Sequence, residues 1–186
     1  MINHKHVVSA LVATTIAVAA PLAAVANEKT ASIQQTVINA KPEVVYNAIL
    51  KLRDESKDTV KEVSRDGQHS CVLEETFDDL PVIGKAKCTY KEVYIPYKKI
   101  EYSLIKSEKF RAFEGTWLLS PTEDGQGTNL SLSSFVDVDL PVPFCKQLCK
   151  MQTMRGVKRR IKMVRSSCEK QALSMKSQGS DQRPVQ

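Results

Sequence analysis

Residues 144–173 constrain the fold of this chain more than any other stretch, because they read as one long helix with two different faces. Apolar and sulfur-containing residues recur there at steps of three and four, which places them on one stripe of an α-helix. The stripe consists of Phe144, Leu148, Met151, Met154, Val157, Ile161, Val164, Cys168 and Ala172. A helix of this kind needs an apolar surface to cover. Gly156 in its middle costs about 1 kcal/mol relative to Ala, which predicts a close contact or a slight bend there.

The other face of this helix is strongly basic. Nine basic residues and one acidic residue give the segment a net charge of +8. Without its first 26 residues the chain has 26 basic and 21 acidic residues, so the part outside the helix is near −3. Such local basicity predicts docking at an anionic membrane surface through Lys158, Arg159, Lys162 and Arg165, and the alternative is a solvated face. Nucleic acid is not expected as a partner, because no aromatic residues lie among the charges.

The first 26 residues have the organisation of a secretory signal peptide. Lys5 precedes an apolar run over residues 7–20, and Ala24-Val25-Ala26 supplies the small-x-small pattern that signal peptidase recognises. The run is too short to span a bilayer as a helix. We therefore expect a periplasmic or secreted protein after cleavage near Ala26. Residues 27–173 are then one domain, predicted to be a monomer, and the polar residues 174–186 are predicted to be a disordered tail.

Between the leader and the long helix, the chain reads as one short helix and a series of strands. Pro42 and Glu43 suit the first turn of a helix that ends near residues 53–56. Turn signals such as Arg65-Asp66-Gly67 and Asp124-Gly125-Gln126-Gly127 separate the strands. The predicted strands are residues 31–39, 58–64, 69–77, 84–95, 98–106, 110–119 and 128–140. The fold class is therefore α+β, with a curved antiparallel sheet of about seven strands wrapped around a long C-terminal helix.

Three stretches of the sequence resemble one known family. Residues 37–46, VINAKPEVVY, are similar to its A-x-P-E-x-V-(W/Y) opening. Residues 113–119, FEGTWLL, with Pro121, Asp124-Gly125 and Thr128, are similar to its G-x-W-x-(L/F)-x-P…D-G…T hairpin. Leu140-Pro141-Val142-Pro143 then precedes a basic final helix, as in that family. The chain thus resembles the START-like (SRPBCC) superfamily, in its polyketide cyclase/dehydrase and lipid-transport group. The resemblance implies a helix-grip fold with a cavity for a hydrophobic ligand between sheet and helix.

Strand alternation gives a list of side chains on the inward face of the sheet. With the stripe of the long helix, it predicts a ligand-binding set, and the plainer alternative is that all of these residues are simply core. The set is Leu73, Phe77, Tyr90, Tyr94, Tyr102, Phe113, Trp117, Leu132, Val136, Met151 and Met154. The same alternation turns His69, Glu75 and Glu92 inward. Burying an unpaired carboxylate is costly, so these three are candidates for fixing a polar headgroup at the mouth of the cavity.

Five cysteines in an exported chain raise the question of disulfides. If Glu74 faces Lys85 across neighbouring strands, Cys71 faces Cys88, and we predict a cross-strand disulfide between them. Cys145, Cys149 and Cys168 are expected to be free. A metal site is not expected, because the cysteines lack zinc-ligand spacing and His69 is the only histidine after the leader. No cofactor is expected either.

Three functions remain open on the sequence alone. The first is an exported binding or carrier protein for a lipid-like molecule, without catalysis. The second is an enzyme of the cyclase/dehydratase type that acts on a hydrophobic substrate in the same cavity. The third is an envelope interaction protein that docks an acidic partner through its basic helix. The sequence contains no Ser/His/Asp or Cys/His arrangement and no phosphate-binding glycine loop, so enzymatic chemistry is less expected.

Overall fold

The computed structural model describes residues 30–80, 83–138 and 144–180. The predicted leader and the Leu140–Pro143 motif lie outside these residues. Within these residues, seven strands and two helices follow one another along the chain. They are β1 (Ser32–Ile38), α1 (Pro42–Glu55), β2 (Val60–Asp66), β3 (Ser70–Leu80), β4 (Gly84–Ile95), β5 (Lys99–Ser107), β6 (Phe110–Pro121), β7 (Thr128–Val138) and α2 (Cys145–Ser180).

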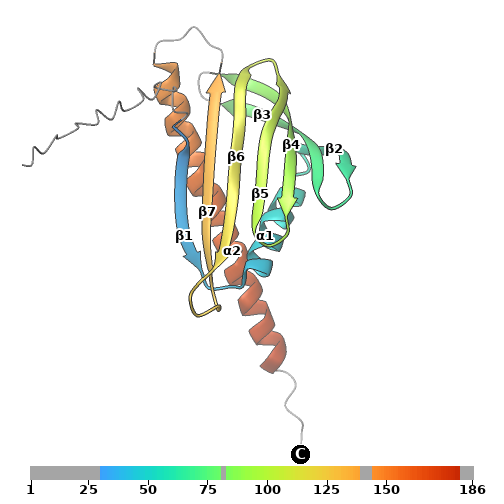
Figure 1. Cartoon of the computed structure of the whole chain (residues 1–186), viewed down its shortest axis with the longest axis vertical. Coiled ribbons are helices and arrows are strands. Elements are labelled where there is room, and N and C mark those ends of the chain that lie inside the picture. The colour runs from blue at the N-terminus through green and yellow to red at the C-terminus, as the bar shows by residue number, and fades with distance from the viewer. Residues whose placement is uncertain (1–29, 81–82, 139–143, 181–186) are drawn as a thin grey trace, which may run out of the picture.

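All seven strands form one antiparallel sheet in the order β1-β7-β6-β5-β4-β3-β2. The sheet is curved, and α2 runs along its concave side, where it packs on β7, β1 and α1 (Figure 1). The predicted fold class, a curved antiparallel sheet around a long C-terminal helix, is confirmed. Because α2 packs closely on one edge of the sheet, space is left between the helix and the other strands. None of the helices in the described part of the chain combines the length and apolar composition needed to cross a bilayer.

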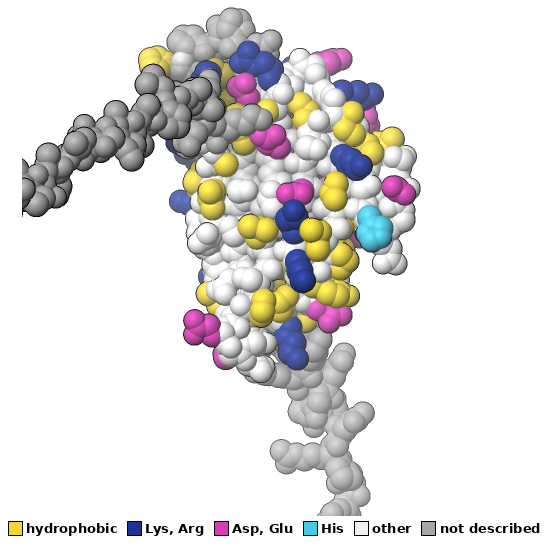
Figure 2. Space-filling model, in the orientation of Figure 1, with side chains coloured by type: hydrophobic (Ala, Val, Ile, Leu, Met, Phe, Trp, Pro, Cys, Tyr) yellow, Lys and Arg dark blue, Asp and Glu magenta, His cyan; other side chains and the backbone are white. Residues whose placement is uncertain are grey.

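Strand alternation predicted the faces of the sheet correctly. The inward side chains of the central strands are aromatic or aliphatic, and most are buried. Those buried in the core include Leu73, Tyr90, Tyr94, Ile100, Tyr102, Phe113, Trp117 and Leu132. The outer face carries scattered apolar side chains, such as Val93 and Ile105, between charged ones (Figure 2).

The predicted pairing of Cys71 with Cys88 is wrong. In the structure Cys71 lies opposite Glu92, Cys88 lies opposite Glu75, and both thiols are free. β3 and β4 pair as far as Leu80 opposite Gly84, with an irregularity after Phe77. The loop between the two strands is therefore shorter than predicted, and the β3–β4 register is shifted by four residues. An even shift keeps every side chain on its predicted face. Burial also raises the pKa of the Cys88 thiol to about 12, which keeps it protonated and unreactive.

The buried stripe of α2 begins differently from the prediction. Phe144 is 72% exposed and has a φ of 63°, so it precedes the helix instead of opening its apolar face. Met151 is 42% exposed, whereas Cys145 is buried. In these first turns the inward-facing residues are displaced by one position from the predicted stripe. These turns face a cavity and not a filled core. Farther along the helix the prediction is confirmed, and the buried residues are Val157, Ile161, Val164 and Cys168.

The helix also extends beyond its predicted end. It continues to Ser180, so the prediction of a disordered tail is wrong for residues 174–180. Once a long helix has formed, each further residue adds a hydrogen bond without a new nucleation step, and no proline interrupts this stretch. Residues 181–186 lie outside the described part of the chain.

Gly115 should be essential to the sheet. A Cβ atom there would overlap the Tyr102 hydroxyl and the backbone carbonyl of Ser133. We expect Gly115→Ala to lower the free energy of unfolding by about 1–3 kcal/mol, as overpacking of a rigid core does. Urea denaturation measures it. In the control, Gly156→Ala, the new Cβ meets nothing within 4 Å, and stability should rise by about 1 kcal/mol. An unchanged midpoint for Gly115→Ala would contradict the packing described.

Candidate functional site

A cavity lies between the concave face of the sheet and α2, in two adjoining chambers. The large chamber, of about 310 Å³, is next to the first half of α2. The small chamber, of about 140 Å³, is next to α1. Phe113 and Arg160 line both, so they form the partition between the chambers. Together the chambers fall within the size range of small-molecule sites in proteins, roughly 300–1,000 Å³.

Aromatic side chains form the sheet wall of the large chamber. The rings of Phe77, Phe110 and Phe113 meet with centroids 5.6 to 6.0 Å apart. Leu80, Val136 and other apolar side chains complete this wall. Such a wall favours an apolar ligand, because apolar surface gains free energy when it leaves water.

The helix wall of the large chamber consists of small or polar residues. They are Cys145, Cys149, Gln152, Thr153 and Gly156, and Leu148, Val157 and three arginines complete this wall. A Cβ atom on Gly156 would have no neighbour within 4 Å, so the close contact predicted at this glycine is wrong. Small residues of α2, among them Cys149, Thr153 and Gly156, therefore leave part of the space in front of the phenylalanine rings unfilled.

The small chamber holds a buried carboxylate. Glu75, from β3, lies 3.9 Å from the guanidinium group of Arg160 on α2. Its side chain is only 14% exposed. Burial raises the pKa of the Glu75 carboxyl, and the attraction of Arg160 counters only part of that rise. Tyr90 interacts with the same carboxyl, and burial raises the pKa of its hydroxyl further above the ordinary value.

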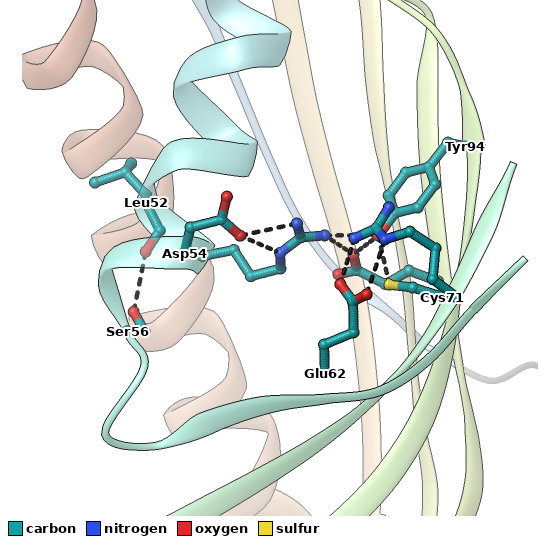
Figure 3. Close-up of polar contacts among 9 residues, drawn as sticks. Leu52, Asp54, Ser56, Glu62, Cys71 and Tyr94 are labelled. Carbon is teal, nitrogen blue, oxygen red and sulfur yellow. Dashed lines mark hydrogen bonds and ion pairs between the residues drawn. The ribbon is translucent and has the colours of Figure 1, made fainter. Parts of the chain in front are cut away.

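A second ion pair closes the α1 end of the small chamber. Arg53 donates hydrogen bonds to Glu92 at 3.0 Å and to the Tyr94 hydroxyl at 2.6 Å, and that hydroxyl donates to Glu92 at 2.6 Å. The Cys71 sulfur is 2.7 Å from the same hydroxyl oxygen. Asp54 approaches the guanidinium group from the other side, so groups from α1 and from the sheet converge on it (Figure 3). The hydrogen bonds from Arg53 to Glu92 and Tyr94 fix α1 to β4.

The structure brings about half of the predicted ligand-binding residues into the chambers. Those that line a chamber are Phe77, Tyr90, Tyr102, Phe113, Trp117 and Val136. Leu73, Tyr94 and Leu132 are buried in the core instead. Met151 is exposed and Met154 half-buried, and neither lines a chamber, because the stripe of α2 is shifted there.

Two of the three residues predicted to fix a polar headgroup line a chamber, and the third does not. Glu75 and Glu92 line the small chamber, each beside an arginine. The prediction that His69 points inward is wrong. His69 lies in the turn between β2 and β3 and is exposed, because β3 begins only at Ser70 and strand alternation does not apply before it.

Sequence reasoning missed the arginines that pair with these carboxylates. Arg160 was assigned to the basic face of the helix. It lies four residues from both Gly156 and Val164, so helical spacing places it on the buried stripe. The predicted docking residues Lys158, Arg159, Lys162 and Arg165 are all exposed. Two of them also contact the protein: Arg159 lines the large chamber, and Arg165 donates hydrogen bonds to the Thr36 hydroxyl and the Val37 carbonyl of β1.

Several solved structures are similar to this one. The protein TTHA0849 from Thermus thermophilus matches with a TM-score of 0.64 and 18% identity, over 75% of this chain and 97% of that one. A START superfamily protein from Mycobacterium smegmatis matches at 0.59 and 15%, over 75% and 97%. The Zhui aromatase/cyclase from Streptomyces sp. R1128 matches at 0.55 and 14%, over 77% and 93%. No protein-family model and no curated protein matches the sequence. The chain has a START-like helix-grip fold, as its motifs predicted.

Glu75 should make stability depend on pH. Its raised pKa means that the folded protein holds this proton more tightly than the unfolded chain does. That contribution to stability is complete below the unfolded pKa of about 4.3 and is lost as the pH rises through the folded pKa. Glu75→Gln cannot titrate, so we expect its free energy of unfolding to rise relative to wild type between pH 4 and pH 8.

Glu74 provides a control of opposite sign. It forms an ion pair with Lys87 on the outer face, and the hydrogen bond from Lys87 lowers the pKa of its carboxyl. That contribution is present above the unfolded pKa and is lost as the pH falls. Glu74→Gln should therefore lose stability relative to wild type as the pH rises. Urea denaturation at several pH values measures both differences, and a pH-independent difference for Glu75→Gln would refute the buried state of this carboxyl.

Proposed function

We propose that this protein binds a hydrophobic, lipid-like molecule in its two chambers and carries it without chemical change. The observation that carries the proposal is the open space beside Gly156. Glycine in a helix interior costs about 1 kcal/mol relative to alanine. A helix glycine often lets another backbone come close, but a Cβ here would meet nothing within 4 Å. The effect of this glycine is therefore to enlarge the chamber, and it lowers the stability of the helix.

The fold and the lining support the same proposal. Ligand sites are mostly apolar with a few convergent polar groups, and the chambers combine phenylalanine rings with Arg160 and Glu75. Among the similar structures are a protein named for the START superfamily and one named as an aromatase/cyclase. A small hydrophobic ligand in the sheet–helix cavity is consistent with both names.

An enzyme of the cyclase type is the second candidate. The observation that favours it is Glu75, a buried carboxyl with a raised pKa beside Tyr90, because such a group is suited to proton transfer. The two candidates predict different results for the ligand recovered from protein purified from its own source. A carrier holds one compound in both wild type and Glu75→Gln. An enzyme yields product from wild type and accumulates substrate in the variant.

The proposal includes a location outside the cytoplasm. Residues 1–26 supply the signal-peptide pattern on which it rests. There the exposed basic residues of α2 would hold the protein at anionic phospholipids while the ligand is taken up or released. Arg159 belongs both to this basic face and to the lining of the large chamber. Docking by this face would therefore bring the chamber close to the lipid.

Filling the chamber tests the binding function. Gly156→Leu adds helix propensity and places apolar atoms in the open space, so it should raise the free energy of unfolding by about 1 kcal/mol or more. The same change should abolish binding of N-phenyl-1-naphthylamine, a neutral apolar dye whose fluorescence rises in such cavities. Gly156→Ala adds one methyl group and should gain about 1 kcal/mol while still binding the dye. If Gly156→Leu is stabilised and binds as wild type does, the chamber is not the binding site.

Membrane docking is tested separately from binding. Lys158→Gln/Lys162→Gln removes two exposed charges of α2 that do not line a chamber. Each lysine near an anionic surface contributes about 1 kcal/mol, so co-sedimentation with phosphatidylglycerol vesicles at low salt should weaken by roughly tenfold or more. Lys91→Gln/Lys98→Gln removes two exposed charges at the sheet and should bind as wild type does. Equal binding by all three proteins would exclude docking through this face.

A further inference from the structure

The large chamber has an excess of positive charge on one wall. Three arginines of α2 line it, Arg155, Arg159 and Arg160, and no aspartate or glutamate whose side chain the structure describes does. Arg160 is compensated by Glu75, 3.9 Å away in the small chamber. Among the described residues, Arg155 and Arg159 have neither an ion pair nor a hydrogen-bonded side-chain partner. The wall therefore presents two guanidinium groups without a directly bonded partner, and the charge of Arg159 also acts on Glu75.

These two groups lie at the mouth of the chamber. Arg155 and Arg159 are exposed although they line it, whereas Phe110 and Phe113 on the opposite wall are 6% and 5% exposed. The two arginines are four residues apart, so they project from the same side of α2, next to Gly156. The cavity is thus apolar at its buried end and cationic where it meets water.

We infer that the large chamber selects a single-chain amphiphile with an anionic headgroup, its tail against the phenylalanine cluster and its carboxylate or phosphate between Arg155 and Arg159. The inference rests on the proposed binding function and adds the ligand class. Guanidinium groups form paired, charge-assisted hydrogen bonds with planar carboxylates and with phosphates. A chamber of about 310 Å³ is at the lower limit for small-molecule sites, so it suits one chain better than two.

The test compares four ligands that share a twelve-carbon chain. Dodecanoate, dodecyl phosphate, dodecanol and dodecyltrimethylammonium, each below its critical micelle concentration, compete with N-phenyl-1-naphthylamine on the purified protein. At least one of the two anions should displace the dye at roughly tenfold lower concentration than dodecanol, and the cation should be the weakest competitor. The ratio of the two anions distinguishes a carboxylate from a phosphate site. Added salt should reduce the advantage of the anions.

Variants separate the headgroup site from the chamber itself. Arg155→Gln/Arg159→Gln should weaken the preferred anion by roughly tenfold to a hundredfold and change dodecanol by less than about twofold. The control, Lys146→Gln/Lys170→Gln, removes the same charge from exposed positions of α2 outside both chambers and should leave the anion's affinity unchanged. If dodecanol competes as well as the anions, or the arginine and lysine variants weaken the anion equally, the headgroup inference fails and the binding function stands. If neither the dye nor any of the four ligands binds, the proposed function itself fails.

Discussion

The contact between α2 and the concave face of the sheet is the interaction on which the other features depend. A curved sheet with an aromatic inner face cannot remain exposed to water, and α2 is the one described element long enough to cover it. Val157, Ile161 and Val164 are almost fully buried in this contact. Because the helix packs on β7 and β1, at one edge, it cannot also fill the space in front of β3 and β4. The cavity follows from this off-centre packing.

The same helix therefore serves two purposes that conflict. Over its second half, large aliphatic residues maximise burial and stabilise the fold. Over its first half, Cys149, Thr153 and Gly156 leave the aromatic wall partly uncovered. A sequence optimised for stability alone would place leucine or isoleucine at these positions, since empty space in a core costs stability. The loss of stability is confined to the stretch of α2 that lines the chamber, which is where a ligand would restore the missing contacts.

Periodicity predicted most of this architecture and failed in two instructive places. Alternation identified the inward residues even though the Cys71–Cys88 register was wrong by four, because side-chain direction repeats every two residues and cannot distinguish registers that differ by an even number. The stripe of α2 was predicted from hydrophobicity, which selected Met151 over the polar residues that do face the sheet. That rule assumes a filled core. It fails in the first turns of α2 because they face a cavity, so the error itself marks the site.

The two arginine–glutamate pairs beside the small chamber differ in how closely they are bonded. Arg53 and Glu92 are 3.0 Å apart, and Tyr94 bonds both of them, so three hydrogen bonds within the protein hold this pair together. Breaking such a pair leaves a buried charge uncompensated and typically costs about 3–5 kcal/mol, so this end of the cavity is structural. Arg160 approaches Glu75 only to 3.9 Å, which is longer than a hydrogen bond, and lines both chambers. The cavity thus has a tightly bonded pair at its α1 end and a looser pair on α2, and this asymmetry gives it a defined direction.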